Sequence, residues 1–415
     1  MSGLEFIEIS CTKRPTRIVV PTSKSYANRL LILAATDPRE IHLKNLPPSS
    51  DVTAMIRCLQ QVGVIIERYE GNSVIVKNCF PECEVQNNQI TELLTGDGGT
   101  TNRFLLAFLA RGKCRYRLLT DGRMGQRPFG EQVDVLRRLG VEVEIGHLRG
   151  QFYFEVQGPY NFFDTSVCVR SSKSTQFASA IMLALHDLLL SRKSSVIPIE
   201  VNSSEKYLKL TSHLISNFNN ASTFDIVPDF SSVAFFVALG AVLGDLLIIN
   251  CSQSDPFQAD AYILEVLKMM GGVYSFSQEG LWISRRELWA YDFDCALAPD
   301  MAPAFCFLAA YAKGNSRLKN VTVLQHKESD RLAEMQKILS LFEIKFTYNE
   351  KECFLEVEGQ SEKTIRPAIT YEAIADHRMI MLAAIFMKKN SGGKIVGHHH
   401  VKKSFVDFFV QLENN

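Results

Sequence analysis

The feature that most constrains the fold of this chain is a pattern that recurs six times, at intervals of roughly 60 to 75 residues. Each copy opens with a short polar or glycine-containing turn. A helix that is apolar on nearly all sides follows, then a strand, an amphipathic helix and further extended segments. The six openings are Ser23-Lys24-Ser25, Gly98-Gly99-Thr100-Thr101, Ser174-Thr175-Gln176, Ser231-Ser232, Asp300-Met301-Ala302 and Asp376-His377-Arg378.

One such β/α unit cannot bury its apolar helix alone, so the copies are expected to stack on a shared core. Three units per domain give an α/β protein with two domains of similar size. The helices after the openings are too apolar to face water and are predicted to lie inside each domain. The alternative is a single doubly wound sheet, which is disfavoured because no Rossmann-type glycine fingerprint follows the first strand.

Composition limits the classes of partner. The 45 Lys and Arg balance the 45 Asp and Glu, so no overall charge favours nucleic acid or an anionic membrane. The ten cysteines are scattered, which fits neither a zinc ribbon nor a disulfide framework and favours a reducing cytoplasm. The N-terminus shows no signal peptide, and the apolar run 233–244 is shorter than the roughly 20 residues that span a bilayer.

The openings predict anion-binding helix starts, since the first N–H groups of a helix are unpaired and carry partial positive charge. Each Ser, Thr or Asp there has a simpler interpretation as a helix cap, which wins by roughly three to one when positions are taken singly. Lys24, Arg29 and Arg103 follow such starts, and cations make the anion-site interpretation stronger. His398-His399-His400 does not suit a metal, because three successive side chains cannot all face one ion.

Several motifs together resemble those of the 5-enolpyruvylshikimate-3-phosphate (EPSP) synthase family. They appear in the family's order and span nearly the whole chain. The matching segments are Pro21 to Arg29, Gly99 to Arg103, Arg123 to Pro128, Lys327 to Leu332, Asp376 to Met379 and Lys403 to Phe405.

The resemblance implies a transferase that moves the enolpyruvyl group of phosphoenolpyruvate to the 5-hydroxyl of shikimate-3-phosphate, giving EPSP and phosphate. This is a step of the shikimate pathway, which leads to chorismate and the aromatic amino acids, and the family is the target of glyphosate. The implied fold is an inside-out α/β barrel of two domains, each with three repeats and buried parallel helices. The N-terminal domain would span 21–228, and the C-terminal domain 229–415 completed by the first strand in 1–20.

The resemblance also implies the site, position by position. Catalytic roles fall on Asp300 as the base for the 5-hydroxyl, Glu328 as the acid, Lys24 and Lys403. The residues for shikimate-3-phosphate are Lys24, Ser25, Arg29, Ser174, Thr175, Gln176, Ser204, Tyr207, Asp300 and Lys327. Those for phosphoenolpyruvate are Lys24, Gly99, Arg127, Gln176, Arg331, Arg378 and Lys403. Arg forks and helix ends bind phosphates and carboxylates without a metal, so no metal and no cofactor are expected.

Some positions depart from the family pattern. Asp97 stands where Asn is usual and brings a negative charge near the phosphoenolpyruvate site. Val323 stands where many members have a substrate-contacting Asn, and Phe104 where Pro is common. Thr22 and Thr175 replace a Gly and a Ser. These departures bear on affinity and inhibitor response more than on the reaction.

Two other functions compete with this one. The sister enzyme that acts on UDP-N-acetylglucosamine shares the fold, but its mobile loop usually carries a Cys, and 121–128 has none. A non-catalytic anion-binding relative is disfavoured because Asp300, Glu328 and Lys403 are all present. The expected partners are the two small-molecule substrates, with no nucleic acid and no membrane, and a cytoplasmic monomer is expected.

Overall fold

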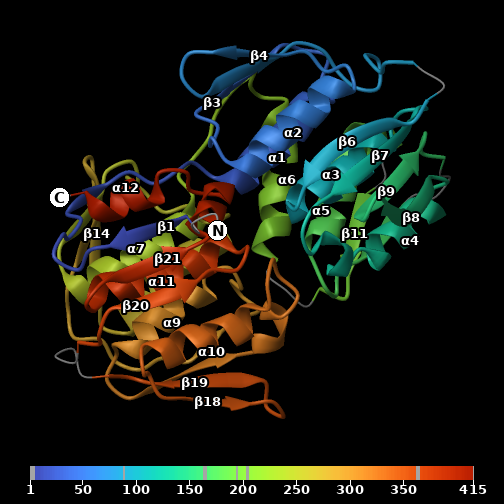
Figure 1. Ribbon diagram of the computed structural model, residues 1–415. Helices are drawn as coiled ribbons and strands as arrows, with labels where there is room; N and C mark the ends of the chain where they lie inside the picture. The colour runs from blue at the N-terminus through green and yellow to red at the C-terminus, as the bar shows by residue number, and fades with distance from the viewer. Residues whose placement is uncertain are drawn as a thin grey trace. The chain divides into compact units, whose positions relative to one another are not determined.

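The structure is a computed structural model that describes residues 5–86, 89–161, 166–192, 195–201, 205–360 and 365–414 (Figure 1). Contacts between Cα atoms divide the chain into two compact units. The continuous unit is Thr22–Val227, and the two-segment unit combines Met1–Pro21 with Pro228–Asn415. The backbone therefore passes between the units twice.

Three helices of each unit form its interior in the described part of the chain. In the continuous unit they are α1 (Lys24–Ala34), α3 (Gly99–Leu109) and α5 (Gln176–Arg192). In the two-segment unit they are α7 (Phe230–Leu243), α9 (Ala302–Ala310) and α11 (His377–Lys389). The three helices of a unit contact one another pairwise, and all nine residues of α9 are buried. These helices have no continuous polar face, so they are stable only where other elements surround them and keep them from water.

Small sheets cover these helices, three per unit among the described residues. In the continuous unit their strand orders are β12-β3-β5-β4, β6-β7-β9-β8 and β10-β11. The strands are β3 (Ile41–Lys44), β4 (Ile66–Tyr69), β5 (Ser73–Val76), β6 (Thr91–Gly96), β7 (Arg115–Thr120), β8 (Glu142–Leu148), β9 (Gln151–Gln157), β10 (Ser166–Arg170), β11 (Ser195–Ile199) and β12 (Thr223–Asp225).

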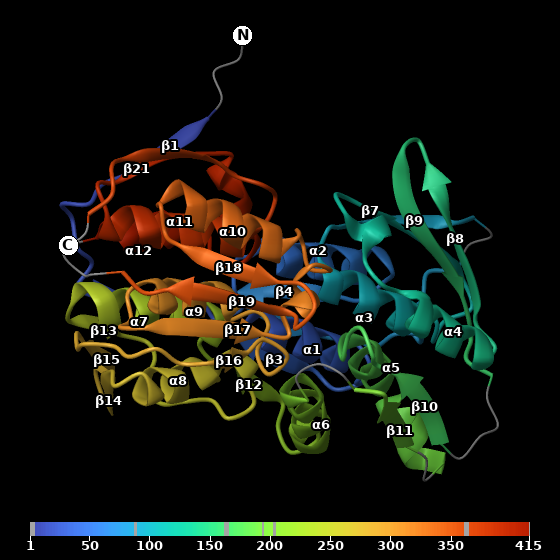
Figure 2. The same cartoon turned by 90° about the horizontal axis from the view of Figure 1, so that it is seen from below.

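The two-segment unit repeats this plan, with orders β14-β15-β13-β2, β16-β17-β19-β18 and β1-β21-β20. Its strands are β1 (Phe6–Ile9), β2 (Arg17–Ile18), β13 (Leu246–Ile248), β14 (Val273–Ser277), β15 (Gly280–Ser284), β16 (Phe293–Asp294), β17 (Asn315–Lys319), β18 (Phe346–Asn349), β19 (Phe354–Glu358), β20 (Ile369–Glu372) and β21 (Gly393–Val396). Each four-stranded sheet among the described residues combines one parallel pair with two antiparallel pairs, one of which is a hairpin of consecutive strands. Helices α7, α9 and α11 contact β13 and β15, β17 and β19, and β1 and β21, respectively (Figure 2).

A second set of helices is amphipathic, and its members bury one face each. In α2, for example, Val52, Met55 and Leu59 are buried while the opposite face is exposed. The members are α2 (Ser50–Gln61), α4 (Gly130–Arg138), α6 (Lys206–Phe218), α8 (Ile263–Met269), α10 (Arg331–Leu341) and α12 (Phe408–Glu413). Short 3₁₀ turns are η1 (Met124–Gln126), η2 (Ala259–Tyr262), η3 (Val321–Leu324) and η4 (His398–Lys403). The α/β class is confirmed, and each of the six predicted openings lies at the start of one of the six interior helices.

The third and sixth copies differ from the expected pattern, since neither forms its own hairpin after the amphipathic helix. Strand β12 follows α6 and pairs in parallel with β3 of the first sheet. In the sheet of the sixth copy the third strand is β1, which pairs antiparallel with β21. Strand β2 instead completes the sheet of the fourth copy, where it pairs in parallel with β13. Strands distant in sequence thus complete these sheets. No helix among the described residues has the length and apolar character needed to cross a membrane.

Candidate active site

Three predicted site residues begin the three buried helices of the continuous unit. Lys24 is the first residue of α1, Gly99 of α3 and Gln176 of α5. The residues before α1 and α3, Ser23 and Gly98, make no side-chain cap hydrogen bond. Because the first N–H groups of a helix have no partner within the helix, these starts suit an anion.

Arg127 lies against the start of α3. A Cβ atom added to Gly99 would come within 2.6 Å of Arg127 Nη2 and 2.8 Å of its Cζ, so the guanidinium approaches the Gly99 backbone closely. Arg127 Nε and Nη1 are buried and donate to no acceptor. A half-buried guanidinium with two buried, unused nitrogens beside a helix start suits a carboxylate or phosphate.

Arg103 and Gln176 connect α3 to α5. Arg103 Nη1 donates to Gln176 Oε1 at 2.5 Å, and Gln176 Nε2 donates to Thr100 Oγ1 at 3.2 Å. Burial, with the charge of Arg127 added, lowers the pKa of Arg103 well below its usual value. Its guanidinium also packs against the rings of Phe129 and Phe177. Arg103 therefore holds Gln176 at the helix start.

Arg29 points into the continuous unit and is 2% exposed. Its nitrogens donate to Ser25 O at 2.9 Å, Thr211 Oγ1 at 2.8 Å and Tyr207 O at 3.4 Å. Burial lowers the pKa of Arg29 to about 10. Phe104, where the family often has Pro, places its ring centroid 5.2 Å from Arg29 Cζ. The guanidinium thus fixes the backbone at two other predicted site residues.

The remaining predicted positions of this unit that the structure describes lie at or near helix starts. Ser25 and Tyr207 are half-buried in the first turns of α1 and α6, and Ser174 and Thr175 directly precede α5. The Ser174 hydroxyl accepts from the Gln176 backbone N–H at 3.3 Å. Ser204 lies outside the described residues.

In the two-segment unit, Asp300 and Asp376 bind the same arginine. Arg331 Nη1 lies 2.7 Å from Asp300 Oδ1, and Arg331 Nε lies 2.8 Å from Asp376 Oδ2. Arg378 Nη2 lies 3.3 Å from the other oxygen of Asp300, and Lys327 Nζ 3.8 Å from Asp300 Oδ1. Asp300 precedes α9, Arg331 begins α10 and Arg378 is the second residue of α11, so three helix starts meet here.

The charges of this cluster determine its protonation. Burial alone would raise the pKa of Asp300, but Arg378, Lys327 and Arg331 hold it well below its usual range. Asp300 is therefore ionised at neutral pH. Burial likewise opposes the charge of Asp376, and Arg331 lowers the pKa of that carboxyl. Burial, with the nearby charge of Asp300, raises the pKa of Asp260 to about 7.

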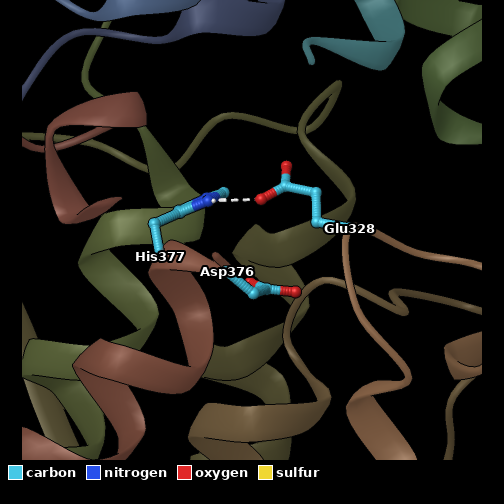
Figure 3. A group of neighbouring side chains, drawn as sticks. All are labelled: Glu328, Asp376 and His377. Atoms are coloured by element: carbon cyan, nitrogen blue, oxygen red, sulfur yellow. Dashed lines mark hydrogen bonds and ion pairs between the residues drawn. The ribbon is translucent and has the colours of Figure 1, made fainter. Parts of the chain in front are cut away.

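Glu328 faces His377 and Lys403 rather than Arg331, which the sequence places three residues away. His377 Nδ1 and Glu328 Oε2 are 2.9 Å apart (Figure 3), and Lys403 Nζ lies 3.5 Å from Glu328 Oε1. Arg378 Nη1 lies 2.9 Å from His377 Nε2. A guanidinium can only donate, so Nε2 accepts and Nδ1 carries the hydrogen that is donated to Glu328. This assigns the neutral Nδ1–H tautomer to His377.

Oxygen and nitrogen atoms of Glu328, Asp376 and His377 all lie within 4.8 Å of one another, a spacing that metal sites share (Figure 3). Their surroundings do not suit a cation. Asp376 Oδ2 already accepts from Ser329 and Arg331, and Glu328 faces Lys403. A metal ion would have to displace or approach these positive charges.

Sequence reasoning assigned no role to four residues that the structure places in these clusters. Asp51 pairs with Lys24 in the continuous unit, and Asp260, Asp376 and His377 belong to the two-segment unit. The motif Asp376-His377-Arg378 was visible in the sequence as a helix opening, yet only its Arg received a role. Of the departures, Asp97 directly precedes the Gly98 cap of α3, and Val323 is half-buried in η3.

Comparison with known proteins identifies relatives over nearly the full length of the chain. The family model described as EPSP synthase (3-phosphoshikimate 1-carboxyvinyltransferase) matches residues 13–412. A 3-phosphoshikimate 1-carboxyvinyltransferase of Paraburkholderia phytofirmans is 28% identical and covers 98% of both chains. One from Enterobacter sp. is also 28% identical and covers 95% of both.

Solved structures share the fold. EPSP synthase from Acinetobacter baumannii superposes with a TM-score of 0.76 at 21% identity, over 98% of this chain and 97% of that one. The enolpyruvyl transferase NikO from Streptomyces tendae gives a TM-score of 0.74 at 14% identity, over 99% and 97%. At these identities the structures establish the architecture only.

Proposed function

This chain belongs to the EPSP synthase family, and from that premise we propose that it transfers the enolpyruvyl group of phosphoenolpyruvate to the 5-hydroxyl of shikimate-3-phosphate. The products are EPSP and inorganic phosphate, and the reaction belongs to the shikimate pathway. The observation that carries the proposal is a pair of carboxylates with different partners. Asp300 is held by Arg331 and Arg378, which lie at two helix starts, and Glu328 is held by Lys403 and by His377, the first residue of α11.

The reaction requires a base and an acid. The 5-hydroxyl oxygen bonds to C2 of phosphoenolpyruvate as its proton leaves, and a proton is added to C3. The bond from C2 to the phosphate oxygen then breaks, and C3 loses a proton. We assign the 5-hydroxyl proton to Asp300 and the C3 proton to Glu328.

Asp300 becomes a stronger base only when Arg331 and Arg378 bind another anion in its place. With Arg331 and Arg378 bound to it, Asp300 is ionised but a weak base. The anionic oxygens of phosphoenolpyruvate would engage these guanidinium groups and weaken their hold on Asp300. Substrate binding would thereby raise the pKa of the base that the reaction needs.

The two carboxylate oxygens of Glu328 have different partners, since His377 donates to Oε2 and Lys403 lies 3.5 Å from Oε1. We propose that Oε1 exchanges the proton once the Lys403 ammonium has turned from Glu328 to the substrate. Lys403 and Lys24 are proposed to neutralise the charge that develops on the transferred group. The other ligand assignments follow the family motifs: shikimate-3-phosphate takes Ser25, Arg29, Ser174, Thr175, Gln176, Ser204, Tyr207 and Lys327, and phosphoenolpyruvate takes Gly99, Arg127, Gln176, Arg331 and Arg378.

We further propose that the continuous unit and the two-segment unit are the two transferase domains. The monomeric state, the cytoplasmic location, the lack of nucleic-acid and membrane partners, and glyphosate sensitivity stay predictions. The second candidate function is enolpyruvyl transfer to a different acceptor, because the fold is shared with the enolpyruvyl transferase NikO.

The test is phosphate release from phosphoenolpyruvate with either acceptor. Release with shikimate-3-phosphate, together with EPSP identified by mass, is the expected result. Release only with UDP-N-acetylglucosamine would assign the sister reaction. No turnover with either acceptor, combined with binding of phosphoenolpyruvate, would identify a non-catalytic relative.

A further inference from the structure

We propose that Asp51 is a positioning residue that holds the Lys24 ammonium at the start of α3, where it meets phosphoenolpyruvate. This inference rests on the proposed function and adds to it a residue that acts through Lys24. Lys24 Nζ lies 2.8 Å from Asp51 Oδ2, and the two side chains are 17% and 5% exposed. The pair is thus largely shielded from water, where a charge pair is strong.

Gly98 shows how closely Asp51 approaches α3. A Cβ atom there would lie 2.7 Å from Asp51 Oδ1 and 2.8 Å from its Cγ. The backbone of Gly98 has φ −73° and ψ 113°, a conformation open to every residue. The backbone conformation therefore does not require a glycine at this position. The carboxylate of Asp51 does, because it leaves no room for a Cβ atom.

The backbone of Asp51 is also tied to α3. The Thr101 hydroxyl donates to Asp51 O at 3.2 Å, and both residues are buried. Asp51 itself lies in the first turn of α2, where the helix dipole favours a negative charge. The position of the carboxylate is thus set by two helices and not by the flexible lysine.

Lys24 needs such a partner because its surroundings are positive. It is the first residue of α1, and a helix start repels an ammonium group. Asp51 brings it to Gly98, and the next residue, Gly99, lies against Arg127. Without a carboxylate at Asp51, the four-carbon side chain of Lys24 is free to turn toward solvent, away from these charges.

Asp51 therefore has a role distinct from that of Arg127. Arg127 offers unused donors to the ligand, while Asp51 offsets the positive charge of Lys24 and fixes the direction of its ammonium group. A misplacement of about 1 Å in a catalytic group can cost about 100-fold in rate. Asp51→Asn should accordingly lower kcat by about 10- to 100-fold, with a smaller but measurable rise in the KM for phosphoenolpyruvate.

A double-mutant cycle distinguishes positioning from a structural role. If Asp51 acts through Lys24, Asp51→Asn should change kcat little in a Lys24→Gln background. Losses that multiply in the double variant would overturn the proposal, because they would show that Asp51 acts independently of Lys24. The matched control is Asp37→Asn, which removes another carboxylate of this unit, paired with Arg39, and should leave kcat unchanged.

A second readout does not need turnover. Phosphoenolpyruvate alone should raise the melting temperature of the parent protein more than that of Asp51→Asn. In the Lys24→Gln variant and the double variant, the rise in melting temperature should be equal. Equal shifts in the parent and Asp51→Asn would contradict the positioning role. If the parent protein fails to turn over, the proposed function fails, and this measurement still decides the role of Asp51.

Discussion

Two residues should separate the chemical step from ligand binding. Glu328→Gln keeps the shape of the side chain and can still accept from His377, but it cannot exchange a proton. We expect kcat to fall by roughly 10²–10⁴, with a small change in the KM of both substrates. Arg127→Ala removes a guanidinium with unused donors and should instead raise the KM for phosphoenolpyruvate.

Steady-state kinetics on both variants tests this contrast, with circular dichroism to confirm folding. Turnover of Glu328→Gln at the parent rate would remove Glu328 as the proton donor. Lys24 or Lys403 would then be the next candidates for that role.

Asp260 gives a pH dependence with a defined sign. This carboxyl is 2% exposed and accepts from the Ser231 hydroxyl, and Oδ1 has no hydrogen-bond partner. Burial, with the charge of Asp300, raises its pKa from 3.8 to about 7 in the folded protein. Between these values the folded state binds more protons than the unfolded state, so the contribution of Asp260 to stability falls as pH rises.

Asp260→Asn mimics the protonated form and should remove this contribution. The stability of the variant relative to the parent should therefore increase from about pH 4 to about pH 7 and then level off. Urea unfolding at several pH values measures the difference. A difference that does not change with pH would show that Asp260 does not titrate in this range.

At the scale of secondary structure, the burial of the interior helices should appear in stability. Leu308 lies in α9 and is 0% exposed, whereas Leu297, in the segment before α9, is 50% exposed. Leu308→Ala should lower the free energy of unfolding by about 2–5 kcal/mol through lost burial and a cavity. Leu297→Ala, the same chemical change, should cost less than about 0.5 kcal/mol.

Denaturant unfolding of the two variants provides the comparison. Similar losses at both positions would mean that α9 is not enclosed as the structure has it.

At the scale of the whole molecule, the two ends of the chain meet at Lys388. This residue is 1% exposed at the end of α11, and its Nζ lies 2.7 Å from both Ser10 O and Glu413 Oε1. Ser10 follows β1 and Glu413 ends α12, so one ammonium group ties both terminal segments to the two-segment unit. Burial lowers the pKa of Lys388, because a charge is costly to remove from water.

The two halves of this pair should therefore respond differently to substitution. Glu413→Gln leaves a buried ammonium without its carboxylate and should cost about 1–3 kcal/mol. Lys388→Met removes the buried charge and leaves a carboxylate that is already 23% exposed, so it should cost less. Thermal unfolding of both variants tests the order, and a larger loss in Lys388→Met would contradict it.

Much of the local structure could be predicted from the sequence, because it depends on neighbours along the chain. The apolar runs and the polar turns before them predicted the interior helices, and Gly99, Gln176 and Arg331 are the first residues of helices at predicted site motifs. The motif order also predicted the family, which the match over residues 13–412 confirms. The roles of the individual site residues stay predictions.

The tertiary structure alone decided which groups face one another. Glu328 is three residues from Arg331 in the sequence, yet it pairs with His377 and Lys403, while Arg331 turns to Asp300 and Asp376. Strand β12 likewise joins β3, and β1 joins β21. Periodicity along one segment specifies which face is apolar, but it holds no information about which distant segment covers that face. That choice depends on how the helices and sheets pack, and the pairing of buried charges follows from it.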